Sequence, residues 1–416
     1  MTMPIYTRDT IVNVEPFTQQ QEGIDIIIGR AETGVFLAVP PEAVELLEDL
    51  ADGKCVGQVA DLYQKRHGEL PDLDEFLGFM EAKGIVTLAS GSNESGISGV
   101  ARTGLEPPRK VRYHFTNISQ SFAQLLFSRT VLVGSAVLIA VALALIIHDP
   151  SITPRPRDLY FADHRTLIWM ILIVVGYAAV FIHELGHLIA ARALGINSRM
   201  GISHRLWHVV AETDLTGLWA VPKRQRYLPL FAGAIIDAVS GALLFLVVFA
   251  QSRHWLALPA LVLQVVRALS FTYVMRIIWQ CLLFIRTDFY YVIASLFNCR
   301  SLLSDTEGFL RNLLARVVPW IRRVNQAGIP ASERKVIRVY AAVWVLGRVV
   351  ALYLLSVVTI PLFIRYSVSL ASAVRAGYSA NPGNFIDAIM FTFYFLMPVS
   401  LGLTLWIRSL IRGERT

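Results

Sequence analysis

The residues most suited to chemistry in this chain are two histidines and a glutamate in the sequence His183-Glu184-Leu185-Gly186-His187. Residues four positions apart share one face of an α-helix, so both imidazoles can bind a single metal ion. Glu184 would project beside that ion and take a proton from a metal-bound water, and Gly186 would leave room near the metal. The spacing predicts a zinc site with His183 and His187 as ligands and Glu184 as the catalytic base.

The chain in front of this motif has the composition of a membrane helix. Residues Thr166–Ile182 carry no charge and lead directly into His183. A pattern this short occurs by chance in roughly one per cent of chains of this length, and two core histidines with hydrogen-bond partners are the other simple explanation. Histidine and glutamate are costly at membrane depth, where they mark functional sites. This context favours the metal site.

A catalytic zinc site usually has three protein ligands and one position for water, so a third ligand must come from elsewhere. Five residues are candidates: His204, His208, Asp214, Asp237 and Asp288. His204 and His208 are also four residues apart, but the mixed polarity around them favours a loop or hairpin. Asp237 interrupts an apolar run, where pairing with Arg267 or Arg276 is the alternative to metal binding.

The composition is that of a polytopic α-helical membrane protein, because 55% of the residues are hydrophobic and 17% are charged. Six apolar runs are long enough to cross a bilayer. They are Thr130–Ile147, Thr166–Leu194, Leu228–Ala250, Trp255–Ile285, Val339–Ile364 and Phe385–Ile407. The fourth contains two arginines and is expected to be either one tilted helix or a broken one.

Lysine and arginine are concentrated in alternate loops, before the first run and after the second and fourth. By the positive-inside rule both termini lie in the cytoplasm, and the metal motif faces the cytoplasmic side. The net charge of +7 then indicates contact with anionic lipid headgroups, not with nucleic acid. Three cysteines without metal-ligand spacing indicate small buried residues.

Residues 24–90 have the pattern of a small α+β domain of winged-helix size, which follows an extended segment, residues 1–23. Ile24–Gly29 and Gly34–Val39 predict a β-hairpin. Apolar periodicity predicts a first helix over Glu42–Ala51 and a second from Val56 to about Tyr63. A capping box that starts at Asp72 predicts a third helix, and Ile85–Leu88 predicts a last strand. Acidic residues on these helices argue against DNA binding. The Gly-, Ser- and Pro-rich residues 91–110 predict a flexible linker to a membrane domain over residues 111–416.

The order of these elements resembles the PqqD-like fold. The sequence segments that carry the resemblance are Val35-Phe-Leu-Ala, Leu46-Leu, Asp52-Gly53, Val59-Ala60 and Phe79-Met-Glu-Ala-Lys-Gly84-Ile-Val. Members of that family recognise the leader segment of ribosomally made, post-translationally modified precursor peptides. They hold the leader as a strand added to the edge of their sheet. The resemblance therefore implies that residues 24–90 bind a precursor peptide.

Residues 110–300 resemble site-2-protease-type zinc metalloproteases, and most of all their peptide-processing bacterial branch. That family has HExxH in one transmembrane helix and an Asp-Gly-Tyr-Tyr motif about a hundred residues later, whose aspartate is the third ligand. Asp288-Phe-Tyr-Tyr matches this motif in place and spacing, and Asp214-Leu-Thr-Gly-Leu-Trp219 resembles the intervening segment. Two departures are Phe289 in place of glycine, and Phe284-Ile-Arg-Thr287 in place of an upstream Asn-Pro.

These resemblances imply a zinc endopeptidase of the bacterial cytoplasmic membrane. It would remove the leader from a modified precursor peptide and pass the product to a peptide exporter. Glu184 would be the base, and His183, His187 and Asp288 would bind zinc. One alternative is regulated intramembrane proteolysis of a transmembrane regulatory protein. Another is a membrane scaffold without catalysis that binds a modified peptide for export or immunity.

Overall fold

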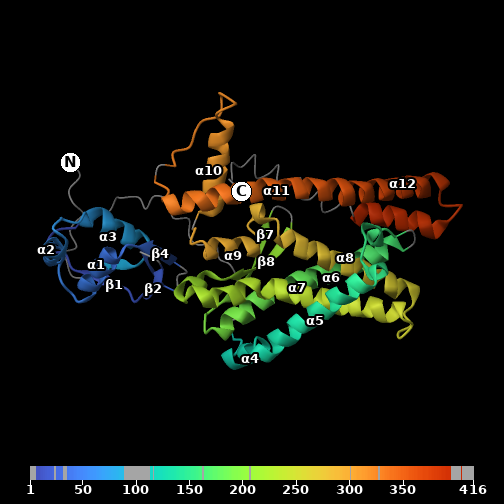
Figure 1. The fold of residues 1–416 in the computed structure, drawn as a ribbon, viewed down its shortest axis with the longest axis horizontal. Helices are drawn as coiled ribbons and strands as arrows, with labels where there is room; N and C mark the ends of the chain where they lie inside the picture. The colour runs from blue at the N-terminus through green and yellow to red at the C-terminus, as the bar shows by residue number, and fades with distance from the viewer. Residues whose placement is uncertain are drawn as a thin grey trace. The chain divides into compact units, whose positions relative to one another are not determined.

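The computed structural model describes residues 6–22, 25–30, 35–88, 113–115, 117–161, 164–205, 208–299, 301–326, 328–394 and 404. The chain divides into two compact units. The N-terminal unit contains Met1–Arg112 together with Ile196–Arg199 and Asp214–Arg226, and the membrane unit contains the rest. Figure 1 labels the elements of both. The predicted linker, residues 91–110, lies outside the described residues.

Five strands belong to the N-terminal unit. Strand β2 (Thr18–Glu22) pairs antiparallel with β3 (Asp25–Arg30), which pairs with β4 (Val35–Val39), as the predicted hairpin requires. Strand β1 (Val12–Val14) pairs antiparallel with β5 (Val86–Leu88), the predicted last strand. Strands β1 and β2 lie in the segment that was expected to precede the domain, so the folded domain starts earlier than residue 24. Strand β2 reads Thr-Gln-Gln-Gln-Glu and is mostly exposed, so it lacks the apolar alternation that would have predicted it.

The three predicted helices of this unit are confirmed as α1 (Pro41–Ala51), α2 (Val56–His67) and α3 (Leu73–Ala82). Proline at the first position suits the start of α1. The carboxylate of Asp72 caps α3 by accepting a hydrogen bond from the backbone N–H of Glu75 at 3.1 Å. The helices and strands enclose one apolar core, in which Leu47, Val59 and Leu77 are fully buried.

Besides the helical residues 382–394, nine helices are described in the membrane unit. They are α4 (Gln120–Leu126), α5 (Arg129–His148), α6 (Arg165–Ala193), α7 (Lys223–Ser252), α8 (Ala260–Gln280), α9 (Asp288–Leu296), α10 (Leu302–Leu314), α11 (Ala331–Leu354) and α12 (Ile360–Ala376). A three-stranded sheet has the order β6 (Tyr113–His114), β7 (Arg199–Arg205), β8 (His208–Asp214). The first four residues of α7 and the ends of β7 and β8 belong to the N-terminal unit.

Five helical runs in the described part of the chain are long and apolar enough to cross a membrane: Gln120–His148, Arg165–Ala193, Lys223–Ser252, Ala260–Gln280 and Glu333–Ala376. The first and third contain the first and third predicted runs, and the second contains the second predicted run except Leu194. The fourth is shorter than predicted, because the chain leaves the helix after Gln280 and forms a 3₁₀ turn, η4 (Leu283–Ile285). The fifth is longer, because α11 continues through a π-helical turn, η5 (Leu355–Thr359), into α12. Most of the predicted sixth run lies outside the described residues, although residues 382–394 are helical.

The N-terminal end of α6 is fixed by residues from the last part of the chain. The carboxylate of Asp387 accepts hydrogen bonds from the backbone N–H of Thr166 at 2.9 Å and from Arg165 Nε at 3.0 Å. Arg165 is 1% exposed, and its Nη1 also donates to Ser369 Oγ on α12 at 2.6 Å. A buried guanidinium needs such partners, so these contacts hold in place the helix that carries the metal motif.

Candidate metal centre

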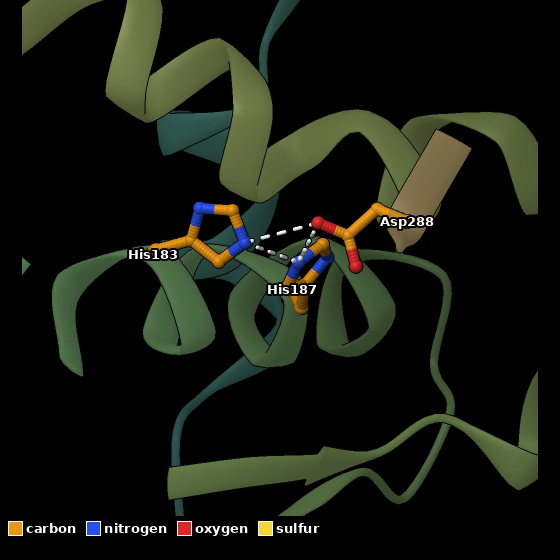
Figure 2. A group of neighbouring side chains, drawn as sticks. All are labelled: His183, His187 and Asp288. Carbon is orange, nitrogen blue, oxygen red and sulfur yellow. Dashed lines mark hydrogen bonds and ion pairs between the residues drawn. The ribbon is translucent and has the colours of Figure 1, made fainter. Parts of the chain in front are cut away.

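The two histidines of the motif and Asp288 meet at one point, as Figure 2 shows. His183 and His187 lie on one face of α6, and Asp288 is the first residue of α9. The two Nε2 atoms are 3.2 Å apart. Asp288 Oδ2 lies 3.0 Å from Nε2 of His183 and 3.3 Å from Nε2 of His187. In the described part of the chain, these three residues are the group whose ligand atoms could share one metal ion.

The spacing of these three atoms fits zinc. Ligand atoms bound to a tetrahedral zinc ion at about 2.0–2.2 Å are separated from one another by about 3.3–3.6 Å. The separations of 3.0, 3.2 and 3.3 Å are close to that value. Two imidazoles and one carboxylate are also a donor set that catalytic zinc sites use, and they leave the fourth position for water.

The hydrogen bonds behind the histidines determine which ring nitrogen is available. His187 Nδ1 lies 2.7 Å from the carbonyl oxygen of Pro229, and His183 Nδ1 lies 2.9 Å from Asp237 Oδ2. Carbonyl and carboxylate oxygens only accept, so Nδ1 is the donor in both rings. In the neutral rings both Nε2 lone pairs then point toward the Asp288 oxygen. A single proton would satisfy one of these contacts at a time, whereas a metal ion would accept all three lone pairs.

Asp237 lies behind His183, away from the convergence point. Its side chain is 2% exposed and is held by Arg276 of α8, whose Nε and Nη2 lie 3.1 Å and 3.0 Å from the two carboxylate oxygens. This is the arginine contact that the sequence offered as the alternative to metal binding. Asp237 therefore orients a ligand, as carboxylates commonly do for metal-bound histidine. The structure places Asp288, not Asp237, with the two histidines.

Asp288 is held in place by Gln280, the last residue of α8. Gln280 Nε2 donates to Asp288 Oδ2 at 2.8 Å, and Gln280 Oε1 accepts from the Asp288 backbone N–H at 3.1 Å. Arg286 adopts a left-handed conformation (φ 54°) in the turn between the two helices. The sequence does not predict this function of Gln280, although a buried amide at the end of an apolar run is a signal of a polar partner.

Aromatic contacts position α9, the helix that starts with Asp288. Phe289 packs its ring against Phe231 of α7, with ring centroids 5.5 Å apart. This residue replaces the glycine of the family that the motif resembles, and its side chain contributes to the packing of α9 on α7. Tyr290 Oη accepts a hydrogen bond from the backbone N–H of Leu303 in α10 at 3.3 Å, which links α9 to α10.

Glu184 is held by Thr213, near the end of β8. The backbone N–H of Thr213 donates to Glu184 Oε2 at 3.1 Å, and Thr213 Oγ1 donates to the Glu184 carbonyl oxygen at 2.8 Å. The carboxylate is half-buried and follows the first histidine by one residue on α6. A strand outside the helix therefore determines the orientation of the predicted base.

Two glycines allow close contacts at this site, and one of them, Gly186, has a different function from the one expected. A Cβ on Gly233 would lie 2.5 Å from Nε2 of both His183 and His187, so this residue of α7 leaves the room at the metal position. A Cβ on Gly186 would instead lie 2.4 Å from Ile236 Cδ1, so Gly186 allows α6 and α7 to approach each other. The expectation that Gly186 leaves room near the metal is thus wrong, because its missing side chain faces the neighbouring helix.

The remaining ligand candidates lie on the predicted hairpin, which is confirmed as β7 and β8. His204 is in β7 and His208 is in β8, and the side chains of residues 202–212 lie outside the described part. The Asp214 carboxylate accepts hydrogen bonds from Arg199 Nε at 3.1 Å and from the Thr216 backbone N–H at 3.1 Å. Burial alone would raise the pKa of Asp214, but the hydrogen bonds from Thr216 and Arg199 outweigh it and lower the pKa. These contacts give Asp214 a structural function.

Comparison with known proteins gives this chain no relative. No protein-family model, no curated protein and no solved structure matches it. The arguments for its function are therefore the convergence of His183, His187 and Asp288, the residues that hold them, and the resemblances in the sequence.

Proposed function

We propose that this protein is a membrane-embedded zinc endopeptidase. The observation that carries the proposal is the convergence of two imidazole nitrogens and the Asp288 oxygen at separations of 3.0–3.3 Å. The order of the motif supports it, because Glu184 directly follows the first ligand as in other HExxH sites. The helices around the site support membrane embedding, since α6, α7 and α8 are all long enough to cross a bilayer.

Each residue then has one function in hydrolysis. A zinc ion bound at this site would lower the pKa of its water towards about 7 and polarise the scissile carbonyl. His183 and His187 would hold the ion through Nε2, and Asp288 would hold it through Oδ2. Glu184 accepts the proton that the attacking water loses and gives it to the leaving amine nitrogen as the C–N bond breaks. Thr213 keeps the Glu184 carboxylate in position through its backbone N–H.

The substrate we propose is a ribosomally made, modified precursor peptide, from which the enzyme removes the leader. The resemblance of the N-terminal domain to peptide-binding PqqD-like domains supports this, as does the small antiparallel sheet β2-β3-β4. An extended peptide can add to the edge of such a sheet through backbone hydrogen bonds. A tether of about 20 residues would keep the captured peptide at high local concentration near the protease.

The N-terminal unit also contains the segment that follows Thr213. The 3₁₀ helix η3 (Thr216–Ala220) packs against strands β2, β3 and β4. Arg226 is buried, and its Nη1 lies 2.9 Å from Glu22 Oε2 at the end of β2. Its guanidinium also stacks over the ring of Trp219 at 4.9 Å. The sheet proposed to bind the peptide therefore contacts η3, which starts three residues after Thr213, the residue that holds Glu184.

The location we propose is the bacterial cytoplasmic membrane, with both termini in the cytoplasm and the metal near the cytoplasmic face. The distribution of lysine and arginine among the loops supports this orientation. A precursor peptide made on ribosomes would then reach the N-terminal domain and the metal from the same side, and a peptide exporter would receive the product.

The test is a comparison of the wild type with Glu184→Gln in the native host. New peptide N-termini are identified by mass spectrometry in strains that express each protein with the genes next to it. Bound zinc is measured in both purified proteins. We expect new termini that require Glu184, with equal zinc in both. Equal zinc without Glu184-dependent termini would instead indicate a metal-binding scaffold, and new termini within a transmembrane regulatory protein would indicate regulated intramembrane proteolysis.

A further inference from the structure

The corner formed by α10 and α11 has the geometry of a segment that lies on the membrane surface. Helix α10 runs across the direction of α11 and α12 (Figure 1). It packs against α11 through Leu302 and Leu303, which join Ile337 and Tyr340 in one buried cluster. The membrane-spanning run that includes α11 starts at Glu333, so the loop before it lies at the membrane edge. A helix that runs across the spans at this level is suited to lie along the bilayer surface.

The end of α10 and the loop after it expose large apolar side chains. Leu313 and Leu314 are 48% and 51% exposed, Val317 is 80% exposed and Trp320 is 84% exposed. Tryptophan is enriched at the membrane–water interface, where its ring lies at the level of the headgroups. An apolar cluster of this kind at the membrane edge is suited to contact with lipid, because exposure to water would be costly.

Four arginines lie in the sequence of this apolar tip. Residues 310–323 contain Arg311, Arg316, Arg322 and Arg323 and neither aspartate nor glutamate. All four arginines are exposed, and none forms an ion pair with another residue in the described part of the chain. Positive charge beside exposed apolar residues complements an anionic bilayer surface.

Hydrogen bonds join the two ends of the loop that follows α10. The Asn312 side chain donates to the carbonyl oxygen of Val324 at 2.9 Å and accepts from the Val324 backbone N–H at 2.8 Å. Gln326 Nε2 donates to the carbonyl oxygen of Asp305 at 2.7 Å. These hydrogen bonds join the two ends of the loop, and Trp320 between them is 84% exposed.

A cavity at the same corner adds two more arginines. It has a volume of about 260 Å³, and its lining consists of Phe309, Gln326, Ile329, Arg334, Ile337 and Arg338. Basic pockets beside membrane helices on the cytoplasmic side bind the headgroups of anionic lipids. Its arginine and apolar lining suits a phosphate group with acyl chains beside it.

We propose that the α10–α11 corner is a binding site for anionic phospholipids, with the ring of Trp320 at the headgroup level and the arginines of this corner on lipid phosphates. The site would also stabilise the metal centre, because α10 is joined to α9 by the Leu303–Tyr290 hydrogen bond and α9 starts with Asp288. The proposal concerns lipid binding and does not depend on the catalytic function.

The test uses a fluorophore at the tip of the loop. Trp320→Cys is made in a chain with Cys55→Ser, Cys281→Ser and Cys299→Ala, labelled with the environment-sensitive dye NBD, and reconstituted into vesicles of neutral phosphatidylcholine with or without phosphatidylglycerol. A nitroxide-labelled lipid with its quencher near the headgroup reports contact. The same labelled chain also carries either Arg316→Gln, Arg322→Gln and Arg323→Gln, or the control set Arg155→Gln, Arg157→Gln and Arg375→Gln. The control arginines are exposed, and the charge pattern places Arg155 and Arg157 before α6 and Arg375 at the end of α12 on the opposite side.

We expect quenching to increase by about twofold or more when phosphatidylglycerol is present, as electrostatic attraction of several arginines requires. The three loop substitutions should remove this increase and the control set should keep it. Equal far-UV circular dichroism and equal elution on gel filtration in all variants would show that they are folded. Quenching that is absent, equal in both kinds of vesicle, or unaffected by the loop substitutions would overturn the proposal and favour a protein partner for this loop.

Discussion

The N-terminal unit and the metal centre are ordered by opposite kinds of contact. In the N-terminal unit the buried side chains are almost all apolar, and an ion pair such as Asp49–Lys54 lies at the edge of the core. In the metal centre the buried atoms are polar, and each is held by another, as His183 is by Asp237 and Asp237 by Arg276. A buried apolar side chain contacts many neighbours, so its contribution to stability is the sum of many small contacts. A buried polar group depends on one or two hydrogen bonds, and loss of a partner leaves it unsatisfied. Substitutions in the two regions should therefore change different measurements, unfolding in one and zinc binding in the other.

The largest effect is expected for Gly233→Ala. Its Cβ would lie 2.5 Å from both ligand nitrogens, and packed imidazoles cannot move away without leaving the metal position. We expect near-complete loss of bound zinc with an unchanged N-terminal unit, measured by metal analysis of detergent-purified protein. Gly176→Ala on α6 is the matched control, because a Cβ there meets nothing within 4 Å. Normal zinc in Gly233→Ala would mean that the metal binds elsewhere.

The converse substitution is Leu47→Ala in the core of the N-terminal unit. Leu47 is 0% exposed, and removal of a buried leucine side chain costs about 2–5 kcal/mol. We expect the calorimetric transition of this unit to move to lower temperature while zinc content stays the same. Phe79→Ala, at a residue that is 48% exposed, should have a much smaller effect. A loss of zinc in Leu47→Ala would contradict the separation of the two regions.

Asp237→Ala tests the hydrogen bond behind His183. It removes the acceptor of the Nδ1 proton and leaves Arg276 without its carboxylate, and loss of such a partner typically weakens metal binding about 10–100-fold. Competition with chelators of graded affinity measures the change. Asp237→Asn, which retains one acceptor oxygen, should lose less. Unchanged affinity in Asp237→Ala would show that the carboxylate does not orient the ligand.

The smallest effect is expected from acidification of the N-terminal unit. Burial alone would raise the pKa of Asp49, but hydrogen bonds from Lys54 and Arg66 outweigh burial and lower the pKa. A lowered pKa stabilises the fold above the pKa of the unfolded chain, about 3.9, and this stabilisation is lost as the pH falls below it. The contribution should be under about 1 kcal/mol, because Lys54 and Arg66 are exposed enough for water to screen them. Calorimetry of the wild type and Asp49→Asn between pH 7 and pH 3 measures it, and equal acid sensitivity in both would exclude Asp49 as the cause.

The sequence predicts those parts of this structure that depend on local patterns. Long apolar runs predict α5, α6 and α7, and the spacing of His183 and His187 places both on one face of α6. The three helices of the N-terminal unit follow from apolar periodicity and from the cap at Asp72. Strands β1 and β2 are not predicted, because a short or polar edge strand carries little apolar alternation.

The contacts that complete the metal centre join residues far apart in sequence. His183 meets Asp237 at a separation of 54 residues and Asp288 at 105. The sequence shows that Asp237 and Asp288 are polar residues next to apolar runs, but it does not show which faces the imidazole Nδ1 and which faces Nε2. The functions of Gly233 and Gln280 likewise depend on how α7 and α8 approach α6, so tertiary structure is needed to find them.

The most direct test of this account is the zinc content of three proteins: the wild type, Asp288→Ala and Asp237→Ala, each dialysed against a weak chelator and analysed by mass spectrometry. The account predicts about one zinc per chain in the wild type, loss in Asp288→Ala, and recovery of zinc by Asp237→Ala when the free zinc concentration is raised. Zinc retained in Asp288→Ala but lost irrecoverably in Asp237→Ala would mean that Asp237, and not Asp288, is the third zinc ligand. A folded wild type without zinc would contradict the metal centre itself.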